Sequence, residues 1–182
     1  LRAPAAWNTT RGSRSVVVAV IDTGIDLDHP DLVHNLWRNP GEIAGDGIDN
    51  DNNGYEDDIH GWDFVSGDAT PNDDIGTGAG SPGHGTHVAG TIAAEGNNSV
   101  GVVGVNWQAS LMALRICGPS GCYLSDFWEA LNYAYNNGAQ VANASFGGQY
   151  NPFQEEEDYI SGVAEPGDFP LQKGVLVVAA AG

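Results

Sequence analysis

One histidine stands between two glycines, in Gly83-His84-Gly85, at the start of a run of small and apolar residues. Because the glycines carry no side chains, a peptide backbone could approach the imidazole of His84 closely. Histidine exchanges a proton near neutral pH, so in this setting it can act as a general acid or base. His84 is therefore a candidate catalytic residue. The alternative is a surface histidine at the start of a helix.

A carboxylate, Asp22, directly follows the unbroken apolar run of residues 16–21. Such a run is typical of a strand in the middle of a parallel sheet, and ligands bind at the carboxyl ends of strands of this kind. A dinucleotide site would require Gly-x-Gly-x-x-Gly after the strand, which Asp22-Thr23-Gly24 does not supply. Asp22 is thus a second candidate for the chemistry, and a carboxylate that caps the next turn is the alternative.

An acidic loop follows, in which oxygen-bearing side chains alternate as in the first half of an EF-hand-type calcium loop. The candidate ligands are Asp49, Asp51 and Asn53, the carbonyl of Tyr55, and Asp57 or Asp58 to close the site. His60 stands where such a loop has its final glutamate, and no pair of helices flanks the segment. The pattern therefore predicts a calcium-binding loop and not a helix–loop–helix sensor. A solvated acidic loop is the alternative.

The elements that must position these residues alternate between strands and helices. We expect strands at residues 16–21, 61–65, 110–116, 140–145 and 174–182, helices at 84–95 and 125–137, and a short helix near 155–163. The last strand, like the first, is expected to be fully buried. This alternation predicts an α/β fold with three layers, in which helices cover both faces of a mostly parallel β-sheet.

The composition of the chain argues against some classes of binding partner. The chain has 182 residues, enough for one domain, with 24 acidic and 6 basic residues and a net charge of -18. Nucleic acid and anionic membranes are poor partners, because a phosphate-binding face needs clustered Lys and Arg. No stretch resembles a transmembrane span. Leu1-Arg2-Ala3-Pro4 is not a signal peptide, so we expect that any export signal has been removed.

Cys117 and Cys122 flank the turn-forming residues Gly118-Pro119-Ser120-Gly121. Such a turn brings its flanks together, which favours a small disulfide and an oxidising compartment. Two free cysteines fit the sequence equally well. A metal site is not favoured here, because no further cysteine or nearby histidine completes a ligand set.

Two motifs resemble those of the subtilisin-like serine proteases, the subtilases. Residues 18–26, Val-Ala-Val-Ile-Asp-Thr-Gly-Ile-Asp, resemble the family's aspartate motif, and residues 84–91, His-Gly-Thr-His-Val-Ala-Gly-Thr, its histidine motif. Residues 143–148 and 177–182 add two more matches, so the resemblance covers essentially the whole chain. It implies a subtilisin-like fold and a serine endopeptidase with an Asp-His-Ser triad, in which Asp22 orients His84 and His84 carries the proton.

The resemblance also implies the surroundings of the triad. An extended polypeptide substrate would lie between two segments, and the pocket for the residue before the cut would favour a large apolar side chain. The implied substrate-binding residues are Ser120, Gly121, Tyr123, Ser145, Phe146, Gly147, Ala180 and Gly182. A calcium site is implied at Asp31 and Asn98, with the carbonyls of Val100 and Val102. The resemblance further implies a secreted protein, and a propeptide or protein inhibitor as a partner.

The family's remaining catalytic groups are not found in the sequence. Its oxyanion-hole asparagine would follow Gly182 directly, and its serine would come far beyond. Ser81, Ser99, Ser125 and Ser145 all lack the expected Gly-Thr-Ser context. We therefore expect residues 1–182 to be the amino-terminal part of one peptidase domain, which needs a carboxy-terminal part as its partner and is inactive alone.

Two other functions remain as alternatives. His84 and His87 could bind a metal in a metal-dependent hydrolase, although the Glu of His-Glu-x-x-His is absent between them. The complete protein could also be a non-catalytic, calcium-binding pseudoprotease module.

Overall fold

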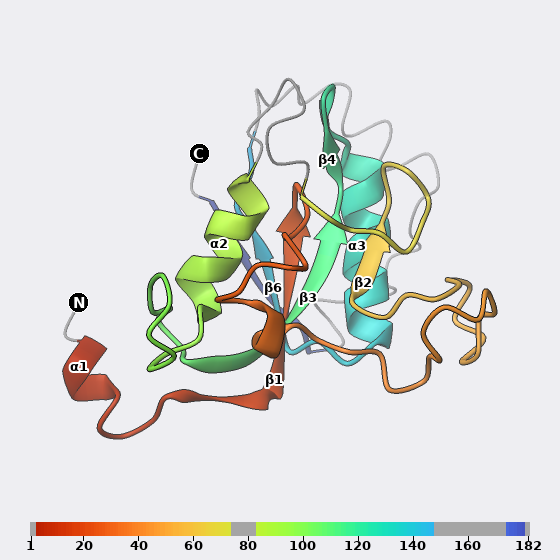
Figure 1. Ribbon diagram of the computed structural model, residues 1–182. Coiled ribbons are helices and arrows are strands. Elements are labelled where there is room, and N and C mark those ends of the chain that lie inside the picture. The colour runs from red at the N-terminus through yellow and green to blue at the C-terminus, as the bar shows by residue number, and fades with distance from the viewer. Residues whose placement is uncertain (1–2, 74–82, 148–173, 181–182) are drawn as a thin grey trace.

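The computed structural model describes residues 3–73, 83–147 and 174–180. Its main sheet is parallel, with the strand order β2-β3-β1-β6-β7 (Figure 1). The elements are α1 (Ala3–Ala6), β1 (Gly12–Asp22), η1 (Val33–Asn35), β2 (Gly61–Asp63), α2 (His84–Ala93), β3 (Gln108–Arg115), β4 (Cys117–Gly118), β5 (Gly121–Cys122), α3 (Leu124–Asn136), β6 (Val141–Ala144) and β7 (Leu176–Ala179). The predicted α/β fold with a mostly parallel sheet is confirmed.

Strand β1 lies in the middle of the sheet because its second half is apolar on both faces. Val18 and Val20 pack in one core cluster with Ala89 and Ala93 of α2. The alternate residues Ala19 and Ile21 pack in a second cluster, with residues of α3. Since successive side chains of a strand point to opposite faces, α2 and α3 cover opposite faces of the sheet. The three-layer arrangement follows from this.

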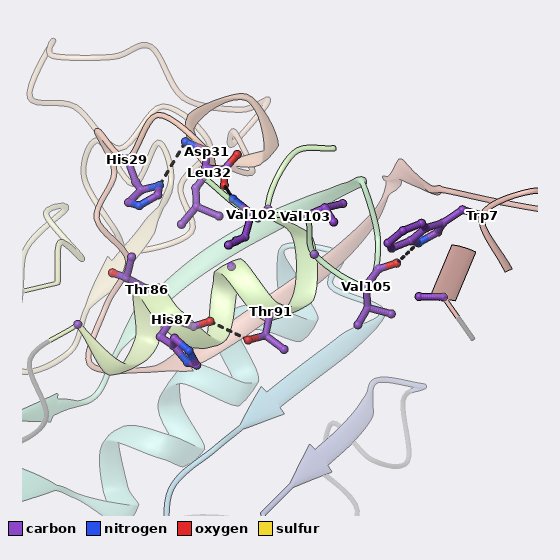
Figure 2. A pocket seen from close by; sticks show the side chains of 15 residues that line it. Trp7, His29, Asp31, Leu32, Thr86, His87, Thr91, Val102, Val103 and Val105 are labelled. Atoms are coloured by element: carbon purple, nitrogen blue, oxygen red, sulfur yellow. Dashed lines mark hydrogen bonds between the residues drawn. The ribbon is translucent and has the colours of Figure 1, made fainter. Parts of the chain in front are cut away.

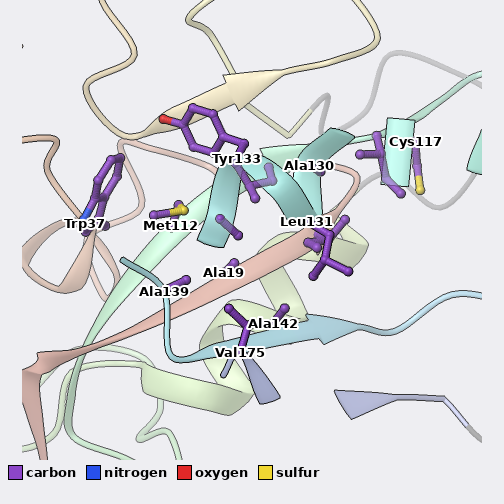
Figure 3. Packing of buried hydrophobic residues seen from close by; sticks show 14 residues of the cluster. Ala19, Trp37, Met112, Cys117, Ala130, Leu131, Tyr133, Ala139, Ala142 and Val175 are labelled. Carbon is purple, nitrogen blue, oxygen red and sulfur yellow. The ribbon is translucent and has the colours of Figure 1, made fainter. Parts of the chain in front are cut away.

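The face covered by α3 combines small and large buried residues, with alanines on two of its central strands (Figure 3). Ala19 of β1 and Ala142 of β6 lie beneath Leu131 and Tyr133 of α3, and all four are buried. Alanines on the strands let the helix approach the sheet closely, so that its larger side chains fill the space between them. This packing holds α3 over the part of the sheet that carries Asp22.

The last strand differs from the prediction. In β7, Leu176 is 62% and Val178 is 47% exposed, because no strand pairs beyond β7 in the described part of the sheet. The expectation of a fully buried strand is wrong for these residues. The short helix expected near 155–163 lies outside the described residues.

No helix in the described ranges is both long enough and apolar enough to cross a membrane.

Candidate active site

Asp22 and His84 meet at the carboxyl edge of the sheet. Asp22 is the last residue of β1 and His84 is the first residue of α2. The Nδ1 atom of His84 lies 2.7 Å from Oδ1 of Asp22. The Asp22 side chain is 1% exposed, whereas that of His84 is 39% exposed. The pair therefore joins a buried carboxylate to an imidazole that reaches solvent.

The buried carboxylate of Asp22 has few other partners. Its Oδ1 atom also accepts a hydrogen bond from the N–H of Thr23, at 2.8 Å. Its Oδ2 atom is buried and has no hydrogen-bond partner among the described residues. A carboxylate in these surroundings is stabilised by a positive charge nearby, and His84 can supply that charge when it accepts a proton on its other nitrogen.

Several groups hold the start of α2 against the end of β1. Gly83, at the N-cap, adopts a left-handed conformation with φ of 83° and offers no capping side chain. The N–H of Gly85 instead donates to Oγ1 of Thr23 at 2.9 Å. The N–H groups of Gly83 and Thr86 donate to the carboxylate of Asp73, each at 3.0 Å. Asp73 was not expected from the sequence, because it lies ten residues before the N-cap Gly83.

His87 does not share the site of His84. Its side chain lies on the outer surface of α2, in a groove of about 620 Å³ that Trp7, Thr91 and Val102 also line and His84 does not (Figure 2). Among the described residues, the metal-ligating side chains that converge in a group of three are in the acidic loop and include neither histidine. The geometry does not favour the alternative of a metal-dependent hydrolase.

The hairpin β4–β5 and the residue directly after it include three of the substrate-binding residues that the family resemblance implies. A disulfide joins Cys117 to Cys122, which confirms the predicted bridge over two free cysteines. The hairpin follows β3, whose Arg115 pairs in register with Asp22. Ser120 and Gly121 are exposed on it, and Tyr123, which directly follows β5, is exposed as well. They therefore lie beyond the sheet edge at which Asp22 meets His84.

The segment after β6 reaches the same edge, because Ala144 pairs in register with Ile21 of β1. Ser145, Phe146 and Gly147 follow directly. The Asn143 amide donates to the hydroxyl of Ser145 at 2.9 Å, and the ring of Phe146 packs edge-on against Phe127 of α3, with centroids 5.5 Å apart.

Ala180 follows β7, and its N–H donates to the carbonyl of Ala144 at 3.1 Å. All the candidate substrate-binding residues in the described part thus lie at one edge of the sheet. Gly182 lies outside that part.

The residues of the calcium site that the family resemblance implies surround Asp31, which is 1% exposed. The Asn98 amide donates to Oδ1 of Asp31 at 2.7 Å, and the N–H of Val102 donates to Oδ2 at 2.8 Å. The N–H of Val100 donates to the side-chain oxygen of Asn98 at 3.1 Å. The structure therefore brings the four residues together, around a carboxylate that a cation would stabilise further.

In the acidic loop, the carboxylate oxygens of Glu42, Asp49 and Asp51 lie within 4.8 Å of one another. Glu42 was missed in the sequence because it precedes the alternating pattern. It is 7% exposed and accepts hydrogen bonds from the N–H groups of Asn50, Asp51 and Asp57. A buried glutamate among these donors is the kind of oxygen ligand that calcium prefers.

The other expected ligands of this loop have different partners. Asp57 accepts hydrogen bonds from the N–H groups of Gly45 and Gly47, at 2.6 and 2.8 Å. Asp58 is fully buried and accepts hydrogen bonds from the amides of Asn39 and Asn53 and from the hydroxyl of Tyr133. Burial raises the pKa of Asp58, and these hydrogen bonds offset part of the rise.

Asn53 and Tyr55 connect this loop to the rest of the chain. The Asn53 amide donates to Asp51 and Asp58, and its oxygen accepts a hydrogen bond from the N–H of Tyr55 at 2.8 Å. The ring of Tyr55 packs edge-on against Trp62 and Tyr133, with centroids 5.0 and 4.9 Å away. The loop is therefore anchored in the core on the α3 face of the sheet.

Known proteins are similar to this chain in both sequence and fold. A model described as "Subtilase family" matches residues 13–182. Thermitase of Thermoactinomyces vulgaris is 35% identical over 186 residues, which cover 100% of this chain and 52% of the relative. Subtilisin-like protease 1 of Plasmodium berghei (strain Anka) is 39% identical over 140 residues, which cover 76% of this chain and 22% of the relative.

A solved structure of a protease from Pseudoalteromonas arctica PAMC 21717 superposes with a TM-score of 0.69 and 32% identity, covering 100% of this chain and 53% of that one. The chain thus spans about half the length of thermitase and of this solved structure, and less of the Plasmodium relative. The matched region includes β1, α2 and the Asp22–His84 pair, and on these grounds the chain belongs to the subtilase family.

Proposed function

We propose that this chain supplies the aspartate and the histidine of a serine endopeptidase. The observation that carries the proposal is the 2.7 Å contact between Nδ1 of His84 and the buried Oδ1 of Asp22. In such a pair the N–H at Nδ1 donates to the carboxylate, which leaves the other ring nitrogen, Nε2, free of its proton and able to take one from a hydroxyl.

In the proposed reaction, Nε2 of His84 takes the proton of a serine hydroxyl as the serine oxygen attacks the peptide carbonyl carbon. Asp22 stabilises the positive imidazolium that forms. His84 then gives the proton to the leaving amine, and in the second half of the cycle it activates water in the same way to release the acyl group. Because the base and the nucleophile act as a unit in such a triad, removing the base costs roughly 10⁴-fold or more in rate.

The serine and the oxyanion-hole asparagine are proposed to lie beyond residue 182, in the carboxy-terminal part of the same domain. The matched relatives extend well beyond this chain, which is consistent with that division. A polypeptide substrate is proposed to bind as an extended strand between residues 120–123 and 145–147, where backbone groups can pair with it. A propeptide or protein inhibitor would use the same segments.

Calcium is proposed as the cofactor, with a structural role. Asp31, Asn98, Val100 and Val102 would hold one ion, and the acidic loop another. In the loop, Glu42, Asp49 and Asp51 fit calcium best because their carboxylates already converge. Asn53, Tyr55, Asp57 and Asp58 have other partners here and would contribute less directly. A bound cation would relieve the repulsion between carboxylates so close together.

Export of the protein is proposed on the basis of the disulfide between Cys117 and Cys122, since such bridges persist in oxidising compartments.

The proposed function is tested in the complete protease with a peptide substrate and a fluorophosphonate probe, which labels only an activated serine. Wild type should cleave the peptide and take up the probe, and His84→Ala should do neither. A complete, folded wild-type protein that binds calcium but neither cleaves peptides nor reacts with the probe would instead be the pseudoprotease.

A further inference from the structure

Asp73 is a buried carboxylate outside the Asp22–His84 pair. It is 3% exposed and lies in the segment between β2 and α2. Its N–H donates to the carbonyl of Ile25 at 3.2 Å, and the N–H of Ile25 donates to the carbonyl of Pro71 at 3.0 Å. These bonds tie residues 71–73 to the chain that leaves β1 just after Asp22.

The same carboxylate caps the helix that carries His84. Its Oδ1 atom accepts the N–H of Gly83, and its Oδ2 atom accepts both the N–H of Thr86, at 3.0 Å, and the Thr86 hydroxyl, at 2.8 Å. The first N–H groups of a helix have no partners within it. Because the N-cap residue is glycine, Asp73 provides from a distance the cap that a side chain at the N-cap usually provides.

Thr86 extends this network back to β1. Its hydroxyl oxygen accepts a hydrogen bond from the N–H of Asp26 at 2.9 Å while its proton goes to Asp73. One hydroxyl therefore connects the segment after Asp22 to the helix turn that begins with His84. On either side of His84, the backbone is held at Gly83, Gly85 and Thr86.

We propose that Asp73 is a positioning residue for the proposed hydrolysis. It does not act on the substrate. It fixes the first turn of α2 relative to the turn after β1, and so keeps Nδ1 of His84 directed at Asp22. This inference rests on the proposed function, because only a working Asp–His pair needs that orientation. A displacement of about 1 Å in a catalytic group can lower a rate on the order of 100-fold.

The test uses the complete protease and compares Asp73→Ala with Asp73→Asn. Alanine removes both acceptor oxygens, and asparagine keeps one. We expect Asp73→Ala to lower kcat by about 10- to 100-fold with KM changed by less than about twofold, and Asp73→Asn to fall between it and wild type. Asp68→Ala is the matched control, because Asp68 accepts the N–H and hydroxyl of Thr70 in the same segment, whereas among the described residues its side chain accepts no hydrogen bond from α2.

A second pair of variants serves if Asp73→Ala does not fold. Thr86→Val removes the bridging hydroxyl at nearly constant volume, and Thr86→Ser retains it. We expect Thr86→Val to lower kcat and Thr86→Ser to keep kcat close to that of wild type. The far-downfield proton resonance of the His84 Nδ1–H, assigned by its loss in His84→Ala, should broaden in Asp73→Ala and Thr86→Val but not in Asp68→Ala or Thr86→Ser.

The outcomes separate the inference from the proposed function. A folded Asp73→Ala with wild-type kcat and an unchanged resonance would overturn the inference, and so would equal kcat values for Thr86→Val and Thr86→Ser. If His84→Ala itself kept its activity, the proposed function would fail, and the positioning role of Asp73 with it.

Discussion

Gly85 in α2 lies so close to Gly24, in the turn after β1, that a Cβ atom on Gly85 would stand 2.1 Å from the Gly24 carbonyl oxygen. The same atom would lie 3.1 Å from Cβ of Asp22. The helix and the turn therefore touch backbone to backbone, with room for a hydrogen atom only. This contact brings the start of α2 within hydrogen-bonding distance of the end of β1.

Gly85→Ala should push α2 away from the turn after β1. Because the obstacle is a backbone oxygen, we expect the free energy of unfolding to fall by about 1–3 kcal/mol and peptide cleavage to fall with it, as His84 moves away from Asp22. Chemical denaturation and kcat/KM of the complete protease measure the two effects.

Gly90→Ala is the control, in the same helix. A Cβ atom there meets nothing within 4 Å, so alanine should stabilise the helix by roughly 0.5–1 kcal/mol and leave activity unchanged. Equal stabilities for the two alanine variants would show that the contact between α2 and the turn is unimportant.

Removing calcium should lower the melting temperature of the protein. An ion at about 100 times its dissociation constant adds roughly 2.7 kcal/mol to the stability of the folded state, and excess chelator should abolish this gain. Glu42→Gln should reduce the loss on chelation, because it weakens the converging group of carboxylates. Asp46→Asn, in the same loop but outside that group, should behave like wild type. A melting temperature that does not respond to chelator would argue against both calcium sites.

Tyr55 should make the fold less stable at alkaline pH. Burial, and next the charge of Glu129, raise the pKa of Tyr55 from 10.0 to about 12. The unfolded chain therefore loses the phenol proton first, and stability falls as the pH rises from about 10 to 12. Tyr55→Phe should reduce that fall, which denaturation at several pH values would measure.

Tyr133 also contributes to the fall in stability at alkaline pH. Tyr55→Phe should therefore remove only part of that fall. Burial and the hydrogen bond to Asp58 also raise the pKa of Tyr133, so part of the loss should remain in that variant. Glu129→Gln should lower the pKa of Tyr55 in a titration of phenolate absorbance. No change there would contradict the role given to Glu129.

The sequence predicted the parts of the site whose signals are local. The apolar run before Asp22 indicates that this residue ends a strand in the middle of the sheet. The glycines around His84 indicate that a backbone approaches it closely. Each of these two signals is contained in a short stretch of neighbouring residues. The parallel sheet followed from the alternation of strands and helices, because that connectivity leaves few other arrangements.

The parts that could not be predicted depend on contacts between distant segments. Asp73 caps α2 from ten residues before its N-cap Gly83, whereas a capping residue is normally sought directly before the helix. Glu42 joins Asp49 and Asp51 only because the chain turns back on itself. The helix expected from residue 125 begins at Leu124 instead, and its N-cap, Tyr123, makes no side-chain capping bond. The hydroxyl of Ser125, in the first turn of α3, donates to Asp126.

The central claim is that Asp22 and His84 act as one unit, and a double-mutant cycle in the complete protease tests it most directly. Asp22→Ala and His84→Ala should each lower kcat/KM by roughly 10⁴-fold or more. The double variant should be no slower than His84→Ala alone, since an aspartate without its histidine has nothing to orient. Losses that multiply in the double variant, or an Asp22→Ala enzyme with near-normal turnover, would contradict the account.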